Sequence, residues 1–169
     1  MGLWLNIFCR EQTGDILLSV DDFFETLDLA ELEIEAGGID MFDLKKTREA
    51  ITIEIAPPLS PPFHNTWCAL VYGIEDGDSI GWDRYAKPEV DRHIEDALEK
   101  LISCDLDAAL QNTLHNRLAA SVELISTRLP NSSVNGIAFP LAREMALWIA
   151  TLRAGVVQFD ETQWYVPEF

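Results

Sequence analysis

The sequence predicts a single α+β domain over 1–169, in which a mainly antiparallel sheet is packed on one face by three to four helices. Three observations support this prediction. Strand-like segments dominate the first half of the chain, helix-like segments dominate the second half, and 156–166 has the pattern of a closing hairpin. Because strands and helices are segregated along the chain, a layered α+β fold is favoured over a doubly wound α/β fold.

The composition agrees with one folded domain. With 169 residues, of which 48% are hydrophobic, the chain is long enough to bury a single core without a disulfide or a metal. No break in composition, internal repeat or low-complexity tract suggests a second domain.

Two strands and a helix are expected in the first forty residues. Residues 3–9 are apolar at nearly every position, which suits a strand at or near the centre of a sheet. A short helix is expected over 20–29, where apolar residues recur at helical spacing after Ser19. Residues 31–37 alternate between apolar and acidic side chains, which indicates a strand or, alternatively, the tail of that helix.

Two further strands flank a proline-rich linker. The period-two pattern of 51–55 stops at Pro57 and predicts a half-buried strand. Residues 66–72 are apolar at both alternating sets of positions, which predicts a strand buried on both faces. The stretch 73–87 is rich in glycine and aspartate and is expected to be a long exposed loop.

Two helices with a tight joint follow. An apolar stripe predicts the first helix over 88–102. The second is expected over 105–129, with Asp105 as its cap and Pro130 as its end. Its expected buried stripe consists of Leu106, Leu110, Leu114, Leu118, Val122, Ile125 and Leu129.

A third helix and the hairpin complete the chain. The helix is expected to begin near Pro140 and to end at Gly155, which is placed as a C-terminal cap. Residues 156–159 and 164–166 then read as two short strands joined by a turn over 160–162.

The charge balance excludes one functional class and suggests another. Twelve Lys and Arg residues oppose 29 Asp and Glu residues, which gives a formal net charge of −17. Such a chain repels polyanions, so we expect no direct binding of DNA or RNA. A basic protein is the expected partner.

The location expected for this chain is the cytoplasm, without a membrane contact. No apolar run approaches the roughly 18 to 20 residues that span a bilayer, and 3–8 lacks the layout of a signal peptide. Cys9, Cys68 and Cys104 are odd in number and widely spaced, which is typical of free thiols in a reducing compartment.

The motifs of common enzyme classes are absent. The chain contains no glycine-rich phosphate loop and no G-x-S-x-G nucleophile elbow. His93 and Asp96 could share a helix face and a divalent metal, but a solvated polar face gives the same pattern. Asp76, Asp78 and Asp83 lie among glycines as in a calcium loop, but the bidentate Glu of such a loop is missing. We therefore assign no catalytic residue, no cofactor and no metal ligand.

The candidate partner-binding residues are acidic side chains and one aromatic anchor. Aromatic side chains supply buried area in an interface, and carboxylates steer a basic partner toward it. These criteria select seven residues, namely Glu31, Glu33, Glu35, Asp76, Asp78, Trp82 and Asp83. Trp164 also lies outside the clear apolar stripes, and burial of both tryptophans in the core is the alternative interpretation.

Parts of the chain resemble small bacterial immunity proteins of polymorphic toxin systems. The resemblance lies in AREMA at 142–146, in AGVVQFD at 154–160 followed by Trp164, and in the strands at 51–58 and around Trp67. It implies an acidic cytoplasmic protein that blocks a cognate toxin by binding it, without a cofactor or catalytic residues. It assigns no contact residue, because such families vary most at their binding surfaces.

Two functional hypotheses follow. The first is a non-enzymatic protein that binds and inhibits or neutralises a basic protein, such as a toxin or a nucleic-acid-binding protein. The alternative is a small enzyme or ligand-binding domain, with a pocket near the 73–87 loop and His93 as an acid or base.

Overall fold

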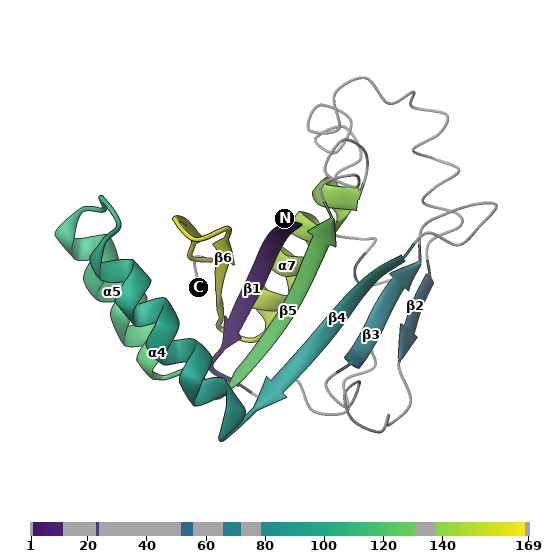
Figure 1. The fold of residues 1–169 in the computed structure, drawn as a ribbon, viewed down its shortest axis with the longest axis horizontal. Helices are drawn as coiled ribbons and strands as arrows, with labels where there is room; N and C mark the ends of the chain where they lie inside the picture. Colours follow the sequence, from purple (N-terminus) through teal and green to yellow (C-terminus); the bar gives the residue numbers. More distant parts are fainter. Residues whose placement is uncertain are drawn as a thin grey trace. The chain divides into compact units, whose positions relative to one another are not determined.

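The structure, a computed structural model, describes residues 2–11, 23, 52–55, 66–71, 79–130 and 138–167. In these ranges it contains seven strands and three helices longer than one turn (Figure 1). In chain order the elements are β1 (Gly2–Cys9), β2 (Thr52–Ile55), β3 (Thr66–Val71), β4 (Ser79–Ala86), α4 (Glu89–Ile102), α5 (Ala108–Ala119), β5 (Glu123–Pro130), α7 (Ala138–Leu152), β6 (Val156–Phe159) and β7 (Gln163–Tyr165).

All seven strands belong to one sheet. Their order is β2-β3-β4-β5-β1-β6-β7, so β1 lies in the interior, as its apolar sequence predicts. The pairs β2/β3, β3/β4, β1/β6 and β6/β7 are antiparallel. The predicted α+β class and antiparallel sheet are therefore confirmed for the part of the chain that the structure describes.

The chain divides into two compact units, and the first consists of Met1–Leu3, Ile16–Asp83 and Thr127–Met145. In this unit β3 and β4 pair so that Cys68 lies opposite Trp82 and Leu70 lies opposite Ile80. All four side chains are buried. The Thr127 hydroxyl donates a hydrogen bond to the backbone oxygen of Gly81 at 2.6 Å, which satisfies a buried polar group of β5.

The second unit consists of Trp4–Asp15, Arg84–Ser126 and Ala146–Phe169. Its core joins the apolar sides of α4 and α5 to one face of β1, β5 and β6. The buried members of this core are Phe8, Val90, Ile94, Ala97, Leu101, Leu114, Leu118, Leu124 and Val156. Trp164 and Tyr85 pack against it. Since Leu5, Ile7 and Val157 point to the opposite face and are also fully buried, both faces of these strands are covered.

A row of polar side chains crosses three strands of the second unit. The Ser126 hydroxyl donates to Asn6 Oδ1 at 2.6 Å, and Asn6 Nδ2 donates to Gln158 Oε1 at 3.2 Å. Gln158 Nε2 in turn reaches the backbone oxygen of Glu161 at 3.5 Å. Each buried amide or hydroxyl therefore has a partner, and the row aligns β5, β1 and β6 with one another.

Two helix ends differ from their predicted caps. The side chain that caps α5 is Asp107, whose Oδ1 accepts a hydrogen bond from the backbone nitrogen of Leu110 at 2.9 Å, so the prediction of Asp105 is wrong. After α7, Ala154 adopts the left-handed conformation with a φ of 48°, and the Gly155 nitrogen donates to the Ala150 oxygen. Gly155 is needed for another reason, because a Cβ there would lie 2.8 Å from the Phe8 oxygen.

Two sequence predictions are wrong in type. The helix expected over 105–129 ends at Ala119, and residues 123–130 form strand β5. Residues 79–86 of the expected 73–87 loop form strand β4, while 73–78 lie outside the described residues. In both cases burial explains the difference, since β5 is buried at most positions and β4 buries Ile80 and Trp82 on one face.

Other elements agree with the sequence. The strands expected at 3–9, 51–55 and 66–72, the helix at 88–102 and the hairpin after residue 155 are confirmed. A third helix is present, although it begins at Ala138. Of the helix expected over 20–29 only Phe23 is described, and the segment 31–37 lies outside the described residues. The single domain and the packing of the helices on one face stay predictions.

Candidate interaction groove

The structure describes two of the seven binding residues predicted from the sequence. Glu31, Glu33, Glu35, Asp76 and Asp78 lie outside the described residues. The remaining two, Trp82 and Asp83, are neighbours on β4.

Trp82 is not an exposed aromatic anchor. Its side chain is 0% exposed, so the alternative interpretation of a core tryptophan is correct for this residue. Asp83, the next residue, is partly buried and lies opposite Thr66 on β3. Trp164 is also mostly enclosed, because it packs against the core of the second unit. The indole nitrogens of both tryptophans are buried without a hydrogen-bond partner.

His93 has a packing partner. Its ring lies against the ring of Tyr85, with centroids 4.8 Å apart and a tilt of 48°. Within the described ranges, no group of three or more His, Cys, Asp or Glu side chains could hold a metal ion.

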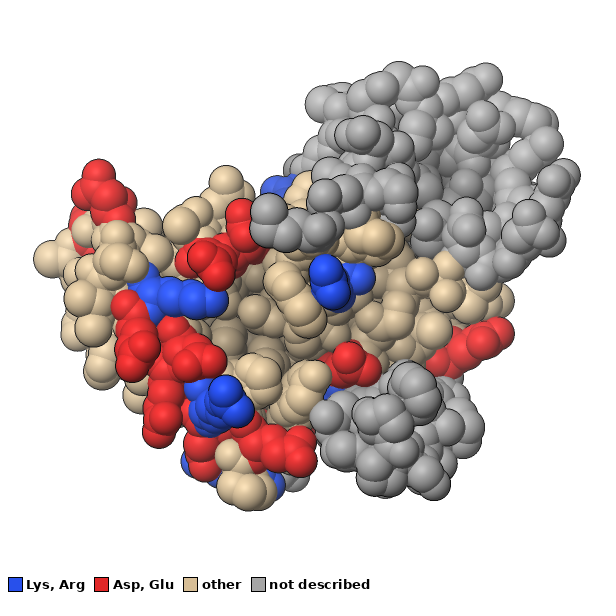
Figure 2. Space-filling model, in the orientation of Figure 1, with Lys and Arg blue, Asp and Glu red and all other residues tan. Residues whose placement is uncertain are grey.

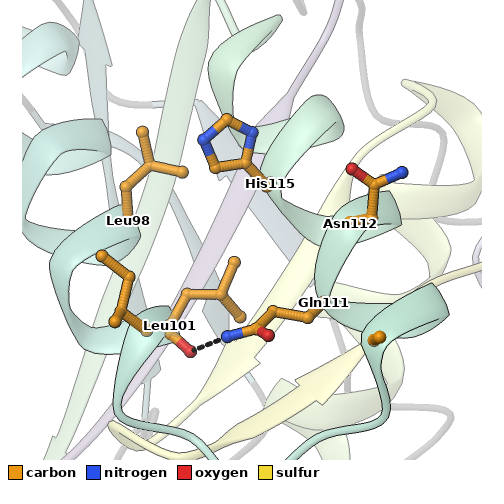
Figure 3. A pocket seen from close by; sticks show the side chains of 7 residues that line it. Leu98, Leu101, Gln111, Asn112 and His115 are labelled. Carbon is orange, nitrogen blue, oxygen red and sulfur yellow. Dashed lines mark hydrogen bonds between the residues drawn. The ribbon is translucent and has the colours of Figure 1, made fainter.

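An open pocket of about 270 Å³ lies between α4 and α5 (Figure 3). We call it the α4–α5 groove. Its α4 wall is apolar and consists of Leu98, Leu101 and Ile102, with Ala108 at the start of α5. Its other wall is polar and consists of Gln111, Asn112 and His115 on α5. One wall can therefore receive an apolar side chain while the other offers hydrogen-bonding groups.

The joint between the two helices fixes the floor of the groove. The side chain of Gln111 donates a hydrogen bond from Nε2 to the backbone oxygen of Leu101 at 3.1 Å. Figure 3 shows this bond, with His115 and Leu98 on facing helices above it. Because Leu101 is buried, this bond satisfies a carbonyl near the end of α4.

Ile102 is the unusual member of the groove. Its side chain is 77% exposed, more than any other large apolar side chain in the described part of the chain. The sequence places it in the buried stripe of the helix, and this prediction is wrong because α4 ends at Ile102 and the chain turns away toward Asp107. Trp4 and Leu152 are the next most exposed large apolar side chains in the described ranges, at 48% and 47%.

The outer side of α4 is acidic. Figure 2 shows acidic side chains gathered over the α4–α5 end of the second unit, with basic side chains among them. Two of the basic groups are paired, since Lys87 lies 3.4 Å from Asp91 and Lys100 lies 3.0 Å from Glu161. Glu95, Asp96 and Glu99 are exposed, and no ion pair joins any of the three to a basic group among the described residues.

Two of these carboxylates, Glu95 and Glu99, lie next to the groove. On a helix, residues three or four positions apart are neighbours on one face. Glu95 is therefore beside Leu98, and Glu99 is beside Ile102. The groove combines an apolar wall with an acidic border, which sequence reasoning missed because it treated the stripe of α4 as core and its charged residues as a solvated face.

Of the three cysteines, only Cys104 has a partly exposed thiol. Cys9, Cys68 and Cys104 are free, and the first two are buried as predicted. Burial raises the pKa of Cys9, and the nearby Glu123 carboxylate raises it further. Burial alone raises the pKa of Cys68 to about 12. Both side chains are therefore neutral core thiols at physiological pH.

No helix of the described ranges has the length and apolar content needed to cross a bilayer.

The chain matches no model of a protein family, no curated protein and no solved structure.

Proposed function

We propose that this chain is a non-enzymatic acidic protein that binds a basic protein and inhibits or neutralises it. The observation that carries the proposal is the exposed set of carboxylates on α4, Glu95, Asp96 and Glu99, of which Glu95 and Glu99 border the open α4–α5 groove. The net charge of −17 extends the same electrostatic attraction over the whole molecule. Carboxylates without an ion-pair partner among the described residues can pair with Lys or Arg of another chain without first breaking an ion pair seen in that part of the structure.

The basic partner that we propose is a toxin or a nucleic-acid-binding protein. Proteins that bind polyanions carry basic surfaces, and an acidic protein can occupy such a surface. The resemblance of parts of the sequence to bacterial immunity proteins agrees with this proposal. The proposal implies that the chain acts in the cytoplasm.

Capture followed by a direct binding measurement tests the proposal. The purified chain is immobilised, exposed to lysate of the native cell at low salt, and eluted with a salt step. Each basic protein released is then purified, and its association rate is measured between about 0.01 M and about 1 M salt, where the Debye length falls from about 30 Å to about 3 Å.

We expect the association rate to fall at least about tenfold over this range, since charge steering is screened by salt. We also expect the activity of the captured protein to fall when the chain is bound. A column that carries an unrelated acidic protein is the control. Partners that associate equally fast at low and high salt would contradict the proposal.

A further inference from the structure

The α4–α5 groove leaves an aliphatic side chain in solvent at the place where it could be covered by another chain. Ile102 is 77% exposed and borders the groove, whereas Leu101 beside it is 1% exposed. Removing an aliphatic side chain of this size from water is favourable. A partner that covers Ile102 would therefore gain affinity from a single side chain.

The size of the groove favours a protein side chain over a small molecule as its occupant. Its volume of about 270 Å³ is below the roughly 300 to 1,000 Å³ of typical ligand pockets, and it is open to solvent. An anchor residue from a protein surface needs only a shallow site with room for one or two side chains. Two helices with a furrow between them are also the kind of surface that receives a third helix.

The charged and polar residues at the border of the groove indicate which further side chains a bound segment needs. Glu95 and Glu99 carry negative charge along the apolar wall, and Asn112 and His115 offer polar groups on the other side. The Oδ1 atom of Asn112 can accept a hydrogen bond from an ammonium or guanidinium group. The opposing charges on the same helix are Arg92, three residues before Glu95, and Lys100, which is paired with Glu161.

We propose that the α4–α5 groove binds a basic amphipathic helix of the partner, which places an aliphatic anchor against Leu98 and Ile102 and Lys or Arg side chains against Glu95 and Glu99. This inference rests on the proposed function and names the site and the chemistry of the partner. Charge complementarity selects this occupant over an acidic or neutral segment.

A designed peptide serves as the probe. The first peptide is helical, with leucines along one face at i, i+3, i+4 and i+7 and lysines elsewhere. The second has the same lysines with serine in place of leucine, so that only the apolar face differs. Binding of each labelled peptide to the chain is measured by fluorescence anisotropy at low salt.

We expect the leucine peptide to bind at least about tenfold more tightly than the serine peptide, because only the former fills the groove. Ile102→Gln removes this preference, and Ile102→Lys also repels the lysines. Leu152→Gln is the matched control, since Leu152 is an exposed aliphatic residue on α7 outside the groove. The melting temperature of each variant verifies that it folds. We expect this temperature to be unchanged, because the substituted positions are exposed.

The charged border is tested separately. The double change Glu95→Gln with Glu99→Gln should weaken binding of the leucine peptide and reduce its salt dependence. Glu54→Gln, at an exposed position on β2, should do neither.

The possible failures are distinct. If Ile102→Gln and Leu152→Gln bind the leucine peptide as well as the unaltered chain does, the groove is not the site. If a salt-sensitive natural partner binds Ile102→Gln normally, the inference fails while the proposed function stands. If no salt-sensitive partner is captured, the proposed function itself fails. A chain that dimerises through the groove, with Ile102→Gln monomeric in sedimentation, would overturn the inference in favour of a second copy as occupant.

Discussion

The backbone oxygen of Leu101 accepts two hydrogen bonds, one from the Gln111 side chain on the next helix and one from the Cys104 nitrogen in the joint. The last carbonyls of a helix have no partner within the helix, so they need donors from elsewhere. Gln111 thus joins α5 to the end of α4 and holds the groove at a fixed width.

Replacing Gln111 with Ala should lower the free energy of unfolding by about 1 kcal/mol, the usual net contribution of such a bond. In a chain of this size the melting temperature should fall by about 2 to 4 °C. Asn112→Ala is the control. Asn112 is the exposed neighbour of Gln111, lines the same groove and makes no described bond across the joint. Equal melting temperatures for the two variants would show that the Gln111 bond contributes nothing.

Asp107→Ala should destabilise the protein by about 1 kcal/mol, because it removes the side-chain acceptor at the start of α5. Asp105→Ala changes the same residue type two positions earlier, outside the cap, and should have an effect within about 0.5 kcal/mol. Chemical denaturation of both variants measures the difference. A larger loss at Asp105 would mean that the helix begins where the sequence alone suggests.

Gly155→Ala should lower the free energy of unfolding by about 1 to 3 kcal/mol. The added methyl group would lie 2.8 Å from the Phe8 backbone oxygen, and a backbone atom in the sheet cannot move aside easily. Gly81→Ala is the matched control, since a Cβ there meets no atom within 4 Å. We expect this control to be neutral or slightly stabilising in thermal denaturation, as Ala loses less backbone entropy than Gly. Comparable losses at both glycines would argue against the close approach.

Thiol labelling should separate the cysteines by burial. In the folded protein at pH 8, Cys104 should react with a thiol reagent quickly, because it is partly exposed. Cys9 and Cys68 should react only as the protein unfolds, because thiolates are the reactive form and burial disfavours them. Reaction progress followed at increasing denaturant gives the test. Rapid reaction of all three thiols in the folded state would contradict the burial of the first two.

Stability should decline in alkaline solution. Burial raises the pKa of Cys68 from 9.0 to about 12, so between these values the unfolded chain loses a proton that the folded chain retains. The free energy of unfolding is therefore unaffected by this thiol below pH 9 and falls by about 1.4 kcal/mol per pH unit above it. Cys68→Ala should reduce the slope of stability against pH by this amount. An unchanged slope would show that Cys68 titrates normally in the folded protein.

The sequence was informative where one pattern has one explanation. The alternation of 51–55 and the apolar run of 3–9 predicted strands that the structure contains, and the stripe of α4 predicted a helix. These patterns reflect burial on a known face, which periodicity reports directly.

The prediction that the helix continues beyond residue 119 is wrong because helical spacing and burial at nearly every position coincide in residues 119–130. Leu118, Val122, Ile125 and Leu129 have helical spacing, yet in β5 nearly every position is buried, so the spacing carries no information. The consecutive Ile125, Ser126 and Thr127, two of them β-branched, are the signal that favoured a strand. In β4, the glycine and aspartate content masked an alternation in which Ile80 and Trp82 are buried and Ser79 and Gly81 are exposed.

The groove could not be found from the sequence, because no motif marks it. It depends on where α4 ends, which leaves Ile102 exposed, and on how closely α5 returns beside it. Both are consequences of three-dimensional packing.

The pairing of β1 with β6 has a consequence for biosynthesis. Leu5 lies opposite Phe159 and Phe8 opposite Val156, so the first strand cannot find this partner until about 150 further residues have been made. At about 5 to 20 residues per second, the nascent strand waits for roughly 8 to 30 seconds. During that interval Leu5, Ile7 and Phe8 are an apolar segment without this strand beside it, which is the kind of sequence that chaperones bind. Such non-local pairing also predicts that the isolated chain refolds more slowly than a helical protein of the same length.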